Sequence, residues 1–276
     1  MSRALTRMLV KEHRRYTQRF PNDMERLRSV LKPGDVLLVE GSQRISEVIK
    51  YLTQSSWSHA GLYVGDALVK RGGARAEELQ QRYGDEASSL LVEATIETGV
   101  AAVALSKYSR HNLRICRPLN LNPGDLSTVL ETVITELGTR YNIDHAIDLL
   151  RYLLPLGLLP KRWRLQALES SARRNGDLIC SSQIAKAFQS VRYPVQPGIS
   201  DPKAHQEGRR EGVWAGLSRL LGRNDGSVFE TSVFTPCDPF LVTPRDFDLS
   251  PYFEIVKFNV AGRKDFDYKK LNWAKP

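Results

Sequence analysis

The chain has 276 residues, 41% of them hydrophobic and 26% charged, which is typical of a soluble globular protein with one large domain. Its formal net charge of +9 favours an anionic partner, whether nucleic acid, an anionic membrane surface or an acidic polymer. Three scattered cysteines are too few for a disulfide framework or a zinc knuckle, and no apolar stretch reaches the roughly 18 residues of a membrane span.

The N-terminal residues 1–32 are basic and carry apolar side chains at helical spacing, a pattern that predicts an amphipathic helix. They contain no uninterrupted apolar segment of the kind found in a Sec signal peptide. We therefore expect a protein that is cytoplasmic or peripheral to a membrane, and export by a route that needs no such signal stays open. Residues 33–260 are expected to form the main domain, followed by a basic tail at 261–276.

Within the main domain, short apolar runs bounded by turn residues predict strands, and longer periodic segments predict helices. The expected strands are residues 35–40, 58–65, 90–96, 112–117 and 252–259, and the expected helices are residues 43–53, 125–138 and a helix that begins near Cys180. Three segments are interpreted as insertions: a charged, exposed excursion at 71–88, an apolar block at 146–165, and a loop rich in Gly, Pro and charge at 196–235.

Cys180 is the first candidate for a catalytic residue. A turn at 175–177 precedes it, and the helical pattern begins immediately afterwards. A thiolate is stabilised at a helix N-terminus, where unpaired backbone N–H groups and the helix dipole favour negative charge. The backbone N–H of such a cysteine can also contribute to an oxyanion hole. A free cysteine is more often a small buried apolar residue, and this is the interpretation kept for Cys116 and Cys237.

His59 and Glu93 are candidates for the groups that activate the thiol. Alternation along its strand places His59 on one face with Gly61 and Tyr63. Glu93 interrupts an otherwise apolar strand, where a carboxylate is costly unless it is paired. An imidazole on a neighbouring strand would be its partner, and the carboxylate would fix the tautomer of that imidazole and support its protonated form. The alternatives are a structural core histidine and an ordinary strand-edge glutamate.

Several short motifs run in order along residues 33–257. They are Gly34-Asp35-Val36-Leu37-Leu38, Ser58-His59-Ala60-Gly61-Leu62-Tyr63, Val92-Glu93-Ala94, Ile179-Cys180-Ser181-Ser182-Gln183-Ile184 and Thr243-Pro244-Arg245-Asp246-Phe247. This series resembles the permuted branch of the NlpC/P60 (papain-like) superfamily, and within it the YiiX/YebB-like permuted papain amidases. In papain-like enzymes the cysteine precedes the histidine, and the permutation reverses that order, as in this chain.

The resemblance implies an α+β, circularly permuted papain-like fold, in which an antiparallel sheet packs against the helix that carries the nucleophilic cysteine. By the same resemblance, Cys180 is the nucleophile, His59 the general base and Glu93 the residue that orients the base. Tyr141 and Ser181 are expected to bind the oxyanion or the substrate. The reaction would pass through a cysteine thioester, followed by hydrolysis or by transfer to a second nucleophile.

No cofactor is implied, and the remaining histidines show no ligand spacing, so we expect no metal site. Basic runs occur without an accompanying aromatic stacking motif, which makes nucleic-acid binding a weak alternative. A non-catalytic binding module that kept the fold is a further alternative, and the intact Cys, His and Glu set argues against it.

Two substrate classes stay open, because relatives by resemblance include both cell-wall peptide amidases and lecithin:retinol acyltransferase-like enzymes of lipid acyl groups. Residues 146–165 combine many leucines with the basic sequence Lys-Arg-Trp-Arg at 161–164. This pattern predicts an interfacial segment in peripheral contact with an anionic membrane, and it slightly favours a lipid acyl substrate over a peptide amide. The other interpretation of the segment is a core helix or its partner loop.

Overall fold

The computed structural model describes residues 16–95, 97–139, 180–196, 198–200, 233–235 and 237–259. The chain divides into a larger unit, residues 1–195 with 238–276, and a smaller unit, residues 196–237. Cys180, His59, Glu93 and Ser181 all belong to the described part of the larger unit, whereas Tyr141 lies outside the described residues.

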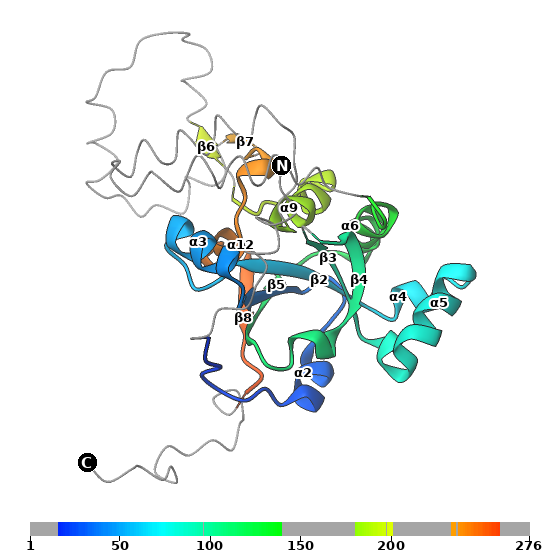
Figure 1. Ribbon diagram of the computed structural model, residues 1–276. Coiled ribbons are helices and arrows are strands. Elements are labelled where there is room, and N and C mark those ends of the chain that lie inside the picture. The colour runs from blue at the N-terminus through cyan, green and yellow to red at the C-terminus, as the bar shows by residue number, and fades with distance from the viewer. Residues whose placement is uncertain are drawn as a thin grey trace, which may run out of the picture. The chain divides into compact units, whose positions relative to one another are not determined.

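The larger unit is organised around a six-stranded antiparallel sheet with the strand order β4-β3-β2-β1-β5-β8 (Figure 1). The strands are β1 (Val36–Glu40), β2 (His59–Gly65), β3 (Leu90–Thr95), β4 (Gly99–Ala104), β5 (Asn112–Pro118) and β8 (Phe253–Val256). Every neighbouring pair in this sheet is antiparallel. With the helices that cover it, the sheet confirms the expected α+β architecture.

Helices and 3-10 turns lie on both sides of the strands. Those of the larger unit are α2 (Met24–Val30), α3 (Arg44–Thr53), α4 (Ala67–Lys70), α5 (Ala74–Tyr83), η1 (Gly84–Ser88), η2 (Leu105–Tyr108), α6 (Pro123–Thr135), α9 (Cys180–Ser190), η5 (Pro239–Leu241) and α12 (Pro244–Leu249). The apolar runs expected at 35–40, 58–65 and 43–53 are therefore confirmed as β1, β2 and α3.

Both faces of the sheet are buried, because the central strands carry apolar side chains at consecutive positions. One face, on which Leu62 lies, packs in a cluster with residues of α6 and α9. The other face, on which Tyr63 lies, packs in a second cluster with residues of α2 and η2. The helix that begins with Cys180 and the turn that ends with Tyr108 are thus held by separate apolar clusters.

The N-terminal helix expected over residues 1–32 is much shorter in the described part. Residues 16–22 are not helical, and α2 begins only after Asp23, whose side chain caps it by accepting from the backbone N–H of Arg26. Pro21 explains the interruption, because a proline disfavours the helical conformation of the residue before it and lacks a backbone N–H. Residues 1–15 lie outside the described residues.

Three further segments differ from expectation. The excursion at 71–88 folds as α5 and η1, and it buries Ala76 and Leu79 against the rest of the unit. Strand β4 was not expected, because its alanine-rich sequence has low strand propensity. The helix expected at 125–138 instead begins at Pro123, after a cap in which the Asn122 side chain accepts from the backbone N–H of Asp125.

The described part of the smaller unit is a two-stranded antiparallel sheet. Its strands are β6 (Gly198–Ser200) and β7 (Val233–Thr235), and Ile199 pairs with Phe234. These strands lie within the loop expected at 196–235. The apolar block at 146–165 and the tail at 261–276 lie outside the described residues.

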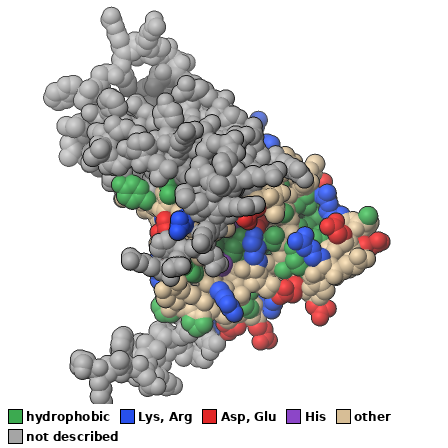
Figure 2. All heavy atoms as spheres, viewed as in Figure 1, with side chains coloured by type: hydrophobic (Ala, Val, Ile, Leu, Met, Phe, Trp, Pro, Cys, Tyr) green, Lys and Arg blue, Asp and Glu red, His purple; other side chains and the backbone are tan. Residues whose placement is uncertain are grey.

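The described residues are close to electrically neutral, although the whole chain is basic. On the face in Figure 2, Lys and Arg side chains are interspersed with Asp and Glu. The excess of Lys and Arg falls instead in residues 1–15, 140–179 and 260–276. Among the described helices, none has the length and apolar character needed to cross a membrane.

Candidate active site

Cys180 is the first residue of α9, as expected from its sequence. Its side chain is only 6% exposed and packs in the same apolar cluster as Ile184, one turn further along the helix. As the first residue of an eleven-residue helix, it lies beside the N–H groups of the first turn, which have no partner within the helix. These groups and the helix dipole favour an anion, either the thiolate or an oxyanion formed on a bound carbonyl.

His59 and Glu93 are brought together by the register of two neighbouring strands. Gly61 of β2 lies directly opposite Glu93 of β3, and residues that lie opposite each other share a face of the sheet. His59 lies on that same face, two residues before Gly61. Its Nε2 is 2.9 Å from Oε2 of Glu93, which confirms the expected contact between the two side chains.

His59 lies between this carboxylate and the thiol. Its side chain is 18% exposed, and the Cys180 side chain lies within hydrogen-bonding reach. Because Nε2 faces Glu93, Nδ1 is the ring nitrogen left for the thiol. Burial lowers the pKa of His59, but the negative charge of Cys180 and then that of Glu93 outweigh it and raise the pKa to about 10. The imidazole is therefore positively charged at neutral pH.

Glu93 is completely buried and has three hydrogen-bond donors. Besides His59, the ammonium of Lys107 binds Oε1, and the phenol of Tyr108 binds Oε2. Burial would raise the pKa of the Glu93 carboxyl, but His59 and Lys107 together hold it well below its usual range. Burial and the neighbouring Glu93 charge raise the pKa of the Tyr108 phenol, which therefore stays a donor.

Lys107 and Tyr108 were not identified from the sequence. They belong to η2, which follows the unexpected strand β4, and β4 pairs with β3 so that Glu93 lies opposite Ala101. A polar pair in a short turn carries no sequence signal of its own. It could have been found only by first placing β4 beside β3.

The side chain of Ser181 is engaged within the protein. It is fully buried, and its hydroxyl donates to the carbonyl of Val242 at 2.6 Å, which fastens the first turn of α9 to the segment between η5 and α12. What Ser181 offers to an oxyanion is its backbone N–H in the first turn of the helix.

The other two cysteines have no comparable surroundings. Cys116 is fully buried in β5, opposite Val36 and Ile255, and burial raises the pKa of its thiol. Cys237 belongs to the smaller unit and is partly exposed. Of the three thiols, that of Cys180 lies within hydrogen-bonding reach of the His59 imidazole and raises its pKa.

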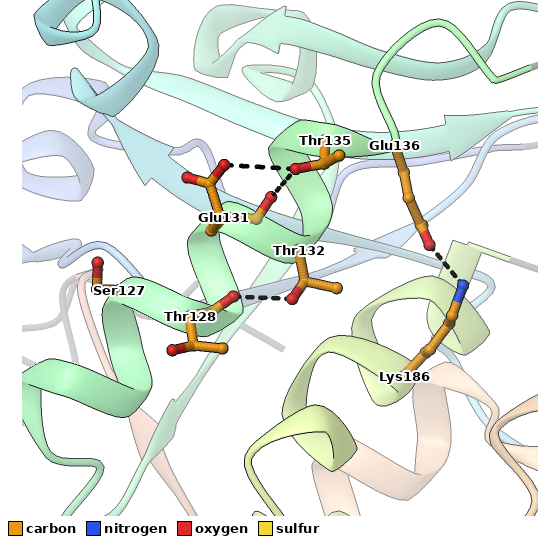
Figure 3. A pocket seen from close by; sticks show the side chains of 7 residues that line it. All are labelled: Ser127, Thr128, Glu131, Thr132, Thr135, Glu136 and Lys186. Carbon is orange, nitrogen blue, oxygen red and sulfur yellow. Dashed lines mark hydrogen bonds and ion pairs between the residues drawn. The ribbon is translucent and has the colours of Figure 1, made fainter.

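A groove of about 520 Å³ opens between α6 and α9 (Figure 3). Its lining is polar and includes Thr128 and Thr132 of α6, whose hydroxyls donate to carbonyls of their own helix. Lys186 of α9 and Glu136 close one side with a 2.6 Å ion pair. The groove contains none of the three candidate catalytic residues. The described residues also hold no group of three or more His, Cys, Asp or Glu side chains that could bind a metal ion.

Comparison with known proteins places the chain beside the permuted papain-like enzymes. Residues 30–152 match the family model Peptidase_C92, described as permuted papain-like amidase enzyme, YaeF/YiiX, C92 family. The match includes His59 and Glu93 and ends before Cys180. It confirms the resemblance noted in the sequence, together with the permuted papain-like fold class.

Among solved structures, the chain is similar to the crystal structure of metalloprotein YiiX from Escherichia coli O157:H7. The two are 14% identical over 82% of this chain and 97% of the other, with a TM-score of 0.45. No curated protein matches the sequence significantly.

Proposed function

We propose that this protein is a papain-like cysteine hydrolase of the permuted amidase type, and that it cleaves an amide or acyl-ester bond with Cys180 as nucleophile, His59 as general base and Glu93 as orienting residue. The observation that carries this assignment is the place of His59. One ring nitrogen faces a fully buried carboxylate at 2.9 Å, and the other is left for a thiol at a helix N-terminus. This is the arrangement that cysteine hydrolysis requires.

The first half of the proposed reaction forms a thioester. The Cys180 thiolate attacks the carbonyl carbon, and the negative charge moves to the carbonyl oxygen, next to the N–H groups of the first turn of α9. The bond from the carbonyl carbon to nitrogen, or to oxygen in an ester, then breaks, while the protonated His59 gives its proton to the departing amine or alcohol. The products are a free amine or alcohol, a neutral thioester and a neutral imidazole.

The second half consumes one water molecule. His59 takes a proton from the water as its oxygen bonds to the thioester carbon. The bond from carbon to sulfur breaks, the carboxylic acid leaves, and the thiolate and imidazolium are restored. Tyr141, which lies outside the described residues, is proposed to assist the oxyanion by resemblance to the family.

Selective alkylation tests the nucleophile. Iodoacetamide at neutral pH should label Cys180 faster than Cys237, as measured by peptide mass spectrometry over a time course. Cys237 is the matched control because it is more exposed than Cys180, so accessibility alone would give the opposite order. The Cys180→Ala variant should lose hydrolysis of acyl-aminocoumarin amides, and Cys237→Ala should keep it. Faster labelling of Cys237 together with an active Cys180→Ala variant would refute the assignment.

The acyl donor is proposed to be a membrane-associated lipid, with a peptide amide as the alternative. The observation that favours the lipid is the sequence of residues 146–165, apolar and followed by basic residues, within one of the segments that hold the chain's excess positive charge. Leucines at an interface, Trp163 at the headgroups and cations near anionic lipid would hold the enzyme at a membrane surface. Each cation adds about 1 kcal/mol of attraction near such a surface.

Liposome co-sedimentation over a range of anionic lipid and salt tests this preference. Binding should rise with anionic lipid and weaken with salt, and it should fall in a variant with polar replacements in the segment. The replacements are Leu158→Ser, Leu159→Ser, Lys161→Gln, Arg162→Gln and Arg164→Gln. No binding by the wild type, or equal binding by the folded variant, would leave the peptide amide as the proposed substrate. Purified enzyme should then be assayed on phospholipids and peptidoglycan fragments side by side.

A further inference from the structure

Lys107 and Tyr108 are consecutive residues that hold the two oxygens of Glu93. The ammonium of Lys107 binds Oε1, and the phenol of Tyr108 shares Oε2 with Nε2 of His59. The Tyr108 ring also lies against the imidazole, with ring centroids 5.9 Å apart. The carboxylate therefore contacts its histidine on one side and the two residues of η2 on the other.

Besides the phenol of Tyr108, four ionisable groups meet in this cluster, and two of them, Cys180 and His59, change their charge during the proposed reaction. In the proposed mechanism, the Cys180 thiolate and the Glu93 carboxylate lie beside the His59 imidazolium and the Lys107 ammonium before acylation. Formation of the thioester removes one charge of each sign, because the sulfur becomes neutral and the imidazole loses its proton to the amine. Glu93 is then a completely buried carboxylate next to a neutral ring, and Lys107 is the cation that still contacts it.

We propose that Lys107 is a positioning residue for the second half-reaction: it keeps Glu93 ionised beside a neutral His59, so that the imidazole is free to take a proton from water. This inference rests on the proposed function, since it concerns the thioester intermediate. A buried carboxylate without a cation either binds a proton itself or retains one on its hydrogen-bonded partner. Either outcome leaves no base for the water. Tyr108 assists by fixing the oxygen that faces the imidazole.

The charged and titratable groups around His59 and Glu93 decide in which direction the pH dependence of deacylation shifts when Lys107 is removed. From the described elements these are Cys180 on α9, and Lys107 and Tyr108 on η2, with His111 edge-on to the Tyr108 ring at 5.4 Å. In the thioester the sulfur carries no charge. Removing Lys107 then makes the pair of His59 and Glu93 hold its proton more tightly. The acid limb of deacylation should move to higher pH.

Burst kinetics with p-nitrophenyl acetate separate the two half-reactions. In Lys107→Met, the burst should form within about twofold of the wild-type rate, while the steady-state rate at pH 7 falls about tenfold, as expected for loss of one hydrogen bond to a charged group. Lys107→Arg should restore most of the steady-state rate. Lys70→Met is the matched control, because Lys70 also pairs with a carboxylate, Asp66, at 3.0 Å but within its own helix turn.

A titration in a Cys180→Ala background provides a readout that needs no activity, because alanine imitates the uncharged sulfur of the thioester. The NMR titration of His59 should shift to higher pH when Lys107→Met is added to Cys180→Ala. The inference would be overturned, and the proposed function left standing, by either of two results. One is the same His59 titration in Cys180→Ala with and without Lys107→Met, and the other is a wild-type burst followed by a wild-type steady-state rate in Lys107→Met. Turnover by Cys180→Ala would overturn the proposed function and the inference with it.

Discussion

His59 and Glu93 are both polar residues of the sheet, yet they are expected to contribute unequally to the rate. The base moves protons in both halves of the reaction, whereas the carboxylate orients and stabilises it. His59→Ala should lower kcat on an amide substrate by about six orders of magnitude, and Glu93→Gln by about four, because loss of the base costs more than loss of the residue that orients it. Circular dichroism would check that both variants fold. Small and equal effects would mean that the two residues are structural.

The protonation of His59 should depend on the thiol beside it. Histidine NMR should show the imidazole of the wild type titrating near pH 10, because Cys180 and Glu93 outweigh the effect of burial on its pKa. Cys180→Ala removes the largest cause that raises this pKa, so the titration should move toward the ordinary value of 6.5. An unchanged titration would show that the thiol does not interact with the ring.

The pKa shifts of His59 and Glu93 predict how the free energy of unfolding varies with pH. His59 is raised in the folded state, so its contribution is fully present below pH 6.5 and is lost as the pH rises through about 10. Glu93 is lowered, so its contribution is present above pH 4.5 and is lost as the pH falls through its folded pKa. Urea unfolding from pH 2 to 11 should show both losses. In Cys180→Ala the alkaline loss should begin at lower pH.

At the scale of elements, a buried ion pair fastens the start of β1 to β5. Asp35 is 1% exposed and accepts from Nε and Nη2 of Arg117 at 2.8 and 2.7 Å, while the same guanidinium also donates to the carbonyl of Val30. The contact joins the strand before the active-site hairpin to the end of α2. The Asp35 side chain also accepts from the backbone N–H of Lys32.

Breaking the pair of Asp35 and Arg117 should lower the stability of the folded protein. Asp35→Asn leaves the Arg117 charge without its partner in a largely buried place, which should lower the free energy of unfolding by about 3 kcal/mol. Asp66→Asn is the matched control: it breaks an exposed pair with Lys70 and should cost about 0.5 kcal/mol or less. Urea denaturation of both variants measures the difference. Equal costs would mean that the Asp35 pair contributes no more than a surface contact.

A second contact between elements supports the turn after η2. The side-chain amide of Asn22 donates to the carbonyls of Tyr108, Ser109 and His111, at 3.4, 3.0 and 2.7 Å. This turn directly follows Lys107 and Tyr108, which bind Glu93. The non-helical segment at 16–22 therefore helps to fix the position of these two residues.

Asn22→Ala should therefore loosen the turn without touching the catalytic groups. Hydrogen exchange should become faster at residues 106–112, and kcat should fall a few-fold with KM unchanged. The control is Ser29→Ala, which removes a hydroxyl that donates to Arg26 within its own helix. If exchange at the turn stays at the wild-type rate, Asn22 does not support it.

At the scale of the whole molecule, local patterns in the sequence predicted that His59 and Glu93 pair, but not the strand register that brings them together. His59 and Glu93 each follow from a local rule, one from the face of its strand and the other from a charge in an apolar run. Their register, with Gly61 opposite Glu93, could not be read from the sequence, because it depends on the excursion between the strands folding away as α5.

The other residues around His59 and Glu93 could not be predicted from local sequence patterns, for physical reasons. Lys107 and Tyr108 follow β4, an alanine-rich strand whose propensity is weak and which is fixed by its pairing with β3. Ser181 was expected to bind the oxyanion or the substrate, and the sequence did not reveal that its hydroxyl donates to Val242, which is distant in sequence. Pro21 does mark a break in the segment expected to be helical, and periodic apolar spacing around it concealed that signal.

The order of the catalytic residues along the chain has a consequence for synthesis on the ribosome. The strands that bring His59 and Glu93 together emerge first, and the helix that begins at Cys180 emerges much later. A nascent chain therefore holds an assembled base long before it holds a nucleophile. In the proposed mechanism, a chain cut short before α9 lacks Cys180 and with it the nucleophile, so incomplete synthesis yields an inert product. Helix α12, whose Phe247 also belongs to the core, emerges later still.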